Sequence, residues 1–92
     1  MLAFKGTAHA NHPDKANVKK THIFNSTSKG EAEGKMMTSL KSECSPAYGW
    51  TDHKVQVQEI AEEDLRKIIS GDLTISGINE RTAAQLLRGT VV

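Results

Sequence analysis

The stretch LAFKGTAHA, residues 2–10, decides the fold of this chain. Apolar or small residues alternate with polar ones, so Phe4, Gly6 and Ala8 share one side of an extended segment. Lys5 lies on the other side. This period of two predicts a half-buried β-strand. The inner side of the strand becomes small toward its end, which leaves room for another element to pack closely against it.

A second strand follows a short turn. Residues 11–15, NHPDK, predict the turn, because Pro13 fixes its own φ angle and the neighbouring Asn and Asp side chains can bond to nearby backbone. Residues 18–25 are rich in β-branched and aromatic residues and predict the strand. Neither side of this strand is cleanly apolar, and lysines occur on both sides. We therefore expect it at the edge of a sheet.

A helix is predicted to begin after Ser28. Ser28 and Glu31 have the spacing of a capping box. An apolar stripe with helical spacing follows and consists of Ala32, Met36, Met37, Leu40 and Cys44. Gly34 weakens this helix by roughly 1 kcal/mol. We expect its missing side chain to allow close approach to the first strand.

The next part of the chain predicts a third strand and a short helix. Residues 54–60 alternate, with valines on one side and Lys or Gln on the other. Residues 61–70 carry acids in the first turn and bases later, which suits the dipole of a helix. Gly71 is expected to end this helix in a left-handed conformation.

The remaining residues complete a single α+β domain. Residues 73–75 predict a short extended piece, and a last helix is expected to be capped by Asn79 and ended by Gly89. The order is then β-β-α-β-α-α. It predicts a small antiparallel sheet in the strand order 2-1-3, with helices packed on one face. The 92 residues leave too few apolar side chains for a second core, so residues 1–92 form one domain.

Charge is distributed unevenly along the chain. The net charge of +1 combines eight lysines and five acids in residues 1–54 with four bases and six acids in residues 55–92. A basic face on a nearly neutral protein indicates contact with phosphates or with an acidic protein patch, unless it is only a solvated surface. No run approaches the ~20 apolar residues of a membrane span, and Lys5 interrupts any signal-peptide core. We expect a soluble protein that does not interact with membranes.

Two groupings resemble chemical sites, and neither is convincing. His9, His12 and His22 invite a metal, but zinc needs converging ligands at fixed spacing, and the chain has no second cysteine. A pair of Cys44 and His53 could form a nucleophile, but Cys44 falls on the apolar stripe, where a thiol is a small hydrophobe. With a single cysteine there is no internal disulfide, which favours a reducing compartment.

No other enzyme signal is present. Glu62, Glu63 and Asp64 are adjacent on a helix and point in different directions, and there is no phosphate-binding glycine loop or serine elbow. We therefore expect a binding protein with no cofactor, no metal and no small-molecule ligand. Tyr48 and Trp50 lie in a loop and could anchor a partner, although Trp50 could instead cover the core. The expected partner-binding residues are Lys5, His12, Lys15, Lys19, Lys20, Lys29, Tyr48 and Trp50.

Three stretches carry a family resemblance: FKGTAHANHPDKANVKKTHIFN, GKMMTSLKSECSPAYGWTDHKVQVQEI and GINERTAAQLLRGTVV. Across its full length the chain resembles phage-encoded anti-CRISPR proteins of the group that inhibits type I-F systems. The resemblance implies a non-enzymatic inhibitor that acts in the cytoplasm of the infected bacterium. It would bind Cas subunits of the crRNA-guided surveillance complex, with possible contact to the crRNA backbone, and prevent recognition of target DNA.

The residues constrain how such an inhibitor works. A nearly neutral chain is a poor mimic of DNA. We expect the lysine-rich hairpin to approach crRNA phosphates or nearby acidic protein, and the acidic C-terminal part to face basic residues along the DNA path. The alternative is a small regulator that binds DNA or RNA directly. Residues 61–88 superficially resemble a helix-turn-helix with Arg81 and Arg88 on its second helix, but the link between the helices is too long.

Overall fold

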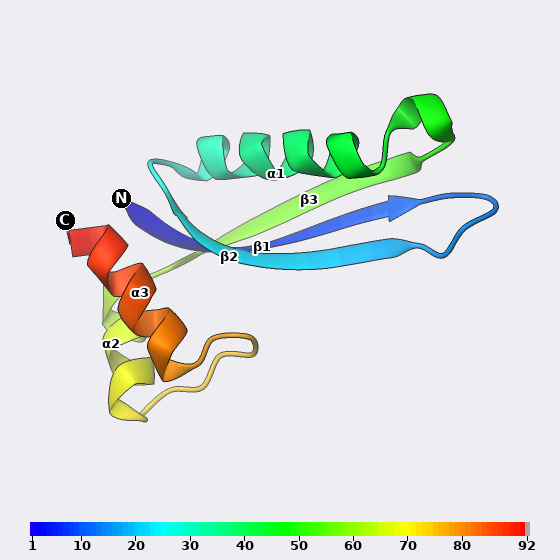
Figure 1. Cartoon of the computed structure of the whole chain (residues 1–92). Helices are drawn as coiled ribbons and strands as arrows, with labels where there is room; N and C mark the ends of the chain where they lie inside the picture. Colours follow the sequence, from blue (N-terminus) through cyan, green and yellow to red (C-terminus); the bar gives the residue numbers. More distant parts are fainter. Residues whose placement is uncertain (92) are drawn as a thin grey trace.

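The computed structural model describes residues 1–91 (Figure 1). The elements are β1 (Leu2–Asn11), β2 (Val18–Ser26), α1 (Lys29–Glu43), the 3-10 helix η1 (Pro46–Tyr48), β3 (Thr51–Ile60), α2 (Glu62–Ser70) and α3 (Glu80–Val91). The order β-β-α-β-α-α and the α+β class are as predicted. No helix in this part of the chain has the length and apolar character needed to cross a bilayer.

The three strands form one antiparallel sheet in the order β2-β1-β3, which confirms the predicted order. Phe4 lies opposite Phe24 of β2, and Gly6 lies opposite Val57 of β3. Alternation therefore puts even-numbered residues of β1 on one face of the sheet and odd-numbered residues on the other. A bulge between His9 and Asn11 shifts the register of the β1–β3 pairing near the tip of the sheet.

Helix α1 packs over the even-numbered face, above β1 and β3 (Figure 1). Ser28 caps it by accepting a hydrogen bond from the Glu31 backbone N–H at 3.1 Å. The close approach occurs at Gly6, where a Cβ atom would lie 1.9 Å from Met36 Sδ. The prediction that Gly34 makes this contact is wrong, because Gly34 is exposed and a Cβ there would meet nothing within 4 Å.

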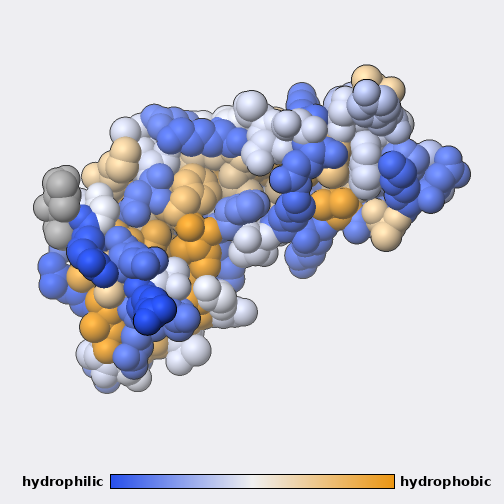
Figure 2. Space-filling view, in the orientation of Figure 1, coloured by the Kyte–Doolittle hydropathy of each residue, from blue (hydrophilic) through white to orange (hydrophobic). Residues whose placement is uncertain are grey.

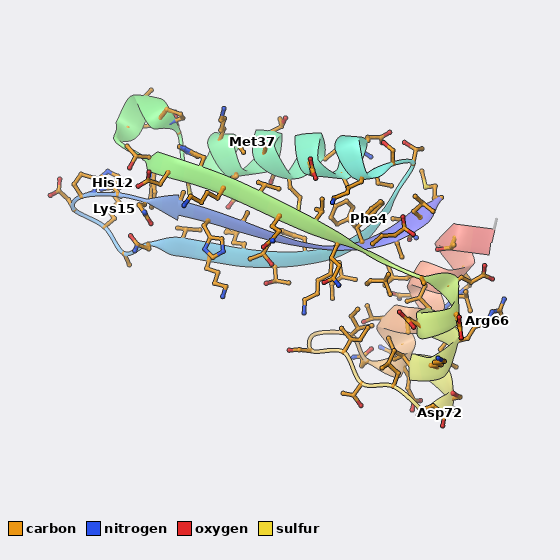
Figure 3. All side chains as sticks on the ribbon, turned by 180° about the vertical axis from the view of Figure 1, so that it is seen from behind. Phe4, His12, Lys15, Met37, Arg66 and Asp72 are labelled. Atoms are coloured by element: carbon orange, nitrogen blue, oxygen red, sulfur yellow. The ribbon has the colours of Figure 1, made fainter. Side chains whose placement is uncertain are left out.

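Helices α2 and α3 pack together at the other end of the molecule. Their apolar side chains cover Ala3 and Ile60, which belong to the face opposite α1. The helices therefore do not all pack on one face, contrary to the expectation: α1 covers one face, and α2 and α3 cover the end of the other. Phe4 belongs to the cluster under α1 (Figure 3). Its neighbour Ala3 belongs to the cluster under α2 and α3. Two apolar clusters thus share the central strand.

The C-terminal part differs from the sequence-based expectation at one helix end. Between α2 and α3, Leu73 and Thr74 belong to no regular element, and Ile75 forms an isolated bridge with Ile78 across a turn at residues 76–77. Gly89 does not end α3, which continues to Val91. The helix continues because nothing in its backbone requires a stop there. Gly71, by contrast, ends α2 with a φ of 87°, as predicted.

Candidate nucleic-acid interface

Most of the odd-numbered face of the sheet is not covered by a helix, and its residues lie in cross-strand rows. The row nearest the tip is Lys19, His9 and Lys54, from β2, β1 and β3. The next rows are Thr21–Thr7–Gln56 and Ile23–Lys5–Gln58. Neighbours in a row have Cβ atoms about 4.5–5.5 Å apart, and rows repeat about every 6.7 Å along the strands. We call these three rows the open face.

The open face carries positive charge and no acid. Within the part of the chain that the structure describes, Lys5, Lys19 and Lys54 take part in no ion pair. By contrast, Lys20 on the opposite face pairs with Glu43 of α1. The Thr and Gln side chains between the lysines can donate and accept hydrogen bonds. Positive charge combined with neutral hydrogen-bonding groups suits the phosphate and sugar of a nucleic-acid backbone.

The segment between α2 and α3 covers one end of the open face. Lys5 Nζ donates to the backbone carbonyl of Ser76, in the segment between α2 and α3, at 2.9 Å. The backbone of Gly77 in the same segment lies close to Ile23, so that a Cβ there would be 3.6 Å from Ile23 Cδ1. This segment extends beneath the sheet in Figure 1. Lys5 is therefore partly used to join the two parts of the fold.

The open face is also hollowed. A cavity of about 410 Å³ lies over it and is lined by Lys5, Thr7, Gln56, Val57 and Gln58. The Gln side chains are exposed and the Thr7 side chain is half-buried. Such a shallow polar hollow on a sheet can hold an extended chain, whereas small-molecule sites are typically concave and apolar. Its chemistry fits a polymer backbone better than a small ligand.

The eight residues expected to bind a partner do not form one surface. Lys5 and Lys19 lie on the open face, but Lys20 points to the opposite face. Lys15 lies in the exposed loop between β1 and β2, far from Lys29 at the start of α1 (Figures 1 and 3). The lysine-rich hairpin is therefore not a single basic surface, because its two adjacent lysines are separated by the sheet.

The other three predicted residues, His12, Tyr48 and Trp50, lie together at the tip of the sheet, where the β1–β2 loop meets the segment before β3. His12 accepts a hydrogen bond at Nδ1 from the Asp14 N–H at 3.0 Å and donates from Nε2 to the Tyr48 carbonyl at 2.9 Å. Its ring packs edge-on against Trp50, with centroids 5.0 Å apart. Trp50 is half-buried against the core, as in the covering role considered for it, whereas Tyr48 is 78% exposed. His12 thus joins the hairpin loop to the loop before β3.

The geometry disfavours both chemical sites considered from the sequence. His9 and His22 lie on opposite faces of the sheet. Within residues 1–91 no three His, Cys, Asp or Glu side chains are grouped so that they could hold a metal ion. His53 does not contact the thiol of Cys44: its Nε2 lies 2.6 Å from the Cys44 backbone carbonyl. The thiol itself is buried in the core under α1.

The sequence reasoning missed the six other polar residues of the open face: Thr7, His9, Thr21, Lys54, Gln56 and Gln58. The signal that could have identified them is the alternation itself. It places Lys5, Thr7 and His9 together on one side of β1, and Lys54 and the glutamines together on one side of β3. This alternation assigns the residues to one side of each strand, but the rows also require the register between the strands.

Two acids of the C-terminal part are paired within their own helix. Glu62 pairs with Arg66 at 2.8 Å and Glu63 with Lys67 at 3.3 Å, each within one turn of α2. These exposed pairs partly neutralise the acids that were expected to face a basic partner. Glu31, in the first turn of α1, lies outside this acidic part: hydrogen bonding to Lys35, and then to Thr27, lowers the pKa of its carboxyl group.

Comparisons with known proteins add no relative. No protein-family model matches the chain, and no match is found among curated proteins or solved structures. Function must therefore be inferred from the site.

Proposed function

We propose that this protein is a non-enzymatic anti-CRISPR inhibitor that binds the type I-F surveillance complex and prevents recognition of target DNA. The observation that carries the contact chemistry is the row Lys19–His9–Lys54, which has basic groups on three adjacent strands and no acid. The open face then lies against phosphates of the guide RNA. The assignment to CRISPR systems rests on the sequence resemblance, and the choice of the open face rests on its basic groups and its lack of acids.

The composition of the open face favours backbone contact over base readout. Lysine is a point charge, whereas reading guanine edges usually requires the bidentate fork of arginine, which the sheet lacks. Target recognition depends on base pairing between guide and DNA in a charged channel. A protein bound along the guide backbone inhibits by occupying the space into which the target strand must enter. It needs no sequence specificity and no catalytic group.

The test uses purified type I-F surveillance complex and the full chain. We expect the two to co-elute in gel filtration, and the loaded complex to lose binding to target duplex in a gel shift. Absence of co-elution would refute the inhibitor function. Normal DNA binding combined with blocked cleavage would instead place the action at nuclease recruitment and contradict the proposed mechanism.

The second candidate is a regulator that binds nucleic acid directly, and the same open face favours it. A gel shift of the isolated protein with single-stranded RNA and duplex DNA is compared with co-elution of the protein and the surveillance complex. Micromolar nucleic-acid binding that falls steeply with salt, together with no co-elution, supports the regulator. The helices do not support a helix-turn-helix, because the segment from Gly71 to Asn79 is longer than the usual 3–4-residue turn and α2 begins with three acids.

A further inference from the structure

We propose that the outer edge of β2 accepts an additional strand from a protein partner, an extended acidic segment with an apolar side chain that fills the groove between β2 and α1. This contact uses a different surface from the open face. It deepens the proposed function by naming the kind of protein segment that is bound. If the partner is the surveillance complex, this inference rests on the proposed function.

The groove exists because α1 lies over β1 and β3 and leaves the same face of β2 partly uncovered. Its floor is apolar and includes Ala8, Phe24, Met36 and Leu40, and it encloses about 200 Å³. A cavity of about 150 Å³ lined by aliphatic side chains is large enough to bind benzene. The groove therefore has room for one large apolar side chain. Figure 2 shows apolar atoms between α1 and the sheet.

The length of the groove matches a short extended segment. Its lining on α1 runs from Lys35 to Glu43, a rise of about 12 Å at 1.5 Å per residue. An extended strand covers that distance in about four residues. The Lys20–Glu43 ion pair connects β2 to α1 at one end of the groove. A strand added to β2 would thus point one or two alternate side chains toward the apolar floor.

The backbone of β2 is available for this pairing. In the three-stranded sheet β2 is an edge and pairs only with β1. Its outer N–H and C=O groups, over Val18–Ser26, are a template for another strand. The other edge, β3, is less suitable because α1 packs more closely against it than against β2.

Charge selects the occupant. β2 contains Lys19, Lys20 and His22 and no acid. On α1 the groove is bordered by Lys35 and Glu43, and Lys35 pairs with Glu31 while Glu43 pairs with Lys20. Within the described residues, Lys19 and His22 are therefore the bases of this edge that take part in no ion pair. Acidic residues directly across from these bases form favourable cross-strand pairs, and basic ones are repelled. A second copy of this chain would bring the same bases to the junction, so edge lysines disfavour self-pairing. The complementary occupant is an acidic extended segment of another protein.

A matched pair of variants tests the groove. Ser39 and Thr38 are exposed neighbours on α1, but Ser39 lines the groove and Thr38 lies on the solvent side. In Ser39→Trp the indole fills the groove, and we expect affinity for the surveillance complex to fall about tenfold or more, while Thr38→Trp stays within about twofold. Backbone amides of β2 should also gain protection from hydrogen exchange in the complex. Equal affinities, or unprotected β2 amides, would overturn the proposal and leave the inhibitor function standing.

A second measurement separates the proposal from the inhibitor function. The free protein is titrated in an NMR experiment with a capped nine-residue peptide of alternating aspartate and leucine, and with a matched lysine–leucine peptide. Shifts at β2 and at Leu40 with the acidic peptide alone, abolished by Ser39→Trp, support the proposal even if no surveillance complex is bound. No shift at millimolar acidic peptide, or equal shifts with both peptides, would overturn it.

Discussion

His9 and Lys54 are direct cross-strand partners on the face of the sheet that α1 does not cover, and Lys19 lies on the other side of His9. No acid of the sheet interleaves with them in this row. Side chains in such a position do not contribute to the core. The row therefore places basic groups on an exposed surface rather than in the core.

The first prediction concerns stability. Lys19 and Lys54 are exposed and unpaired within the described residues. The free energy of unfolding of Lys19→Gln and of Lys54→Gln should therefore each stay within about 0.5 kcal/mol of the wild-type value. Urea denaturation measures this. A loss of several times that amount would show that the lysines serve the fold, and would remove the reason for assigning them to a ligand.

Substituting alanine for Gly6, which faces α1, and for Gly34, which lies within α1, should change stability in opposite directions. In Gly6→Ala the new Cβ would clash with Met36 Sδ and with Val57 Cγ1, so we expect a loss of about 1–3 kcal/mol from overpacking. In Gly34→Ala, on the exposed side of α1, we expect a gain of up to about 1 kcal/mol from helix propensity. Denaturant unfolding of both variants checks the sign. Equal effects would mean that α1 does not pack closely on β1.

Asn25 should hold the helical end to the sheet. Its Nδ2 donates to the carbonyls of Leu2 and Leu86, at 3.3 and 3.1 Å, so it links β1 to α3. In Asn25→Ala, we expect faster hydrogen exchange in α3 while the amides of β1 stay protected. Asn17→Ala, in the exposed hairpin loop, is the matched control. Unchanged exchange in α3 would show that its apolar packing suffices.

The contact between the β1–β2 loop and the loop before β3 should depend on His12 in the tautomer that carries its proton on Nε2. A carbonyl can only accept and a backbone N–H can only donate, so the two hydrogen bonds of His12 define this tautomer. Nitrogen chemical shifts of the ring at neutral pH measure it directly. We also expect His12→Ala, but not His22→Ala, to shift the fluorescence of Trp50, the single tryptophan, to longer wavelength. A ring protonated at Nδ1 alone would contradict the arrangement.

Local patterns predicted the elements of this fold because each strand alternates and each helix has its own cap or stop. They did not predict where α2 and α3 pack, since that depends on Ala3 and Ile60 meeting across two strands. The end of α3 was misplaced for a similar reason. Gly89 is needed for space rather than for a turn, because a Cβ there would lie 2.4 Å from Asn25 Oδ1. Proximity of this kind is not readable from spacing.

The candidate site was predicted only in part. Lysines were grouped by their position in the chain, which put Lys19 and Lys20 together although the sheet separates them. The partners of Lys19 on the open face lie far away in sequence, and Lys54 is 35 positions later. An interface made of cross-strand rows becomes visible only when register and the uncovered face are both known.

The most direct test of the open face is charge reversal with a matched control. Lys19→Glu/Lys54→Glu and Lys29→Glu/Lys41→Glu change the net charge equally, but the second pair lies on α1. Affinity of each variant for the purified surveillance complex is measured at physiological salt, after circular dichroism has shown an intact fold. We predict that the open-face variant loses affinity by about a hundredfold, as expected for two reversed phosphate contacts, and that the α1 variant binds like the wild type. Equal affinity of the two variants would contradict the assignment of the open face as the nucleic-acid contact.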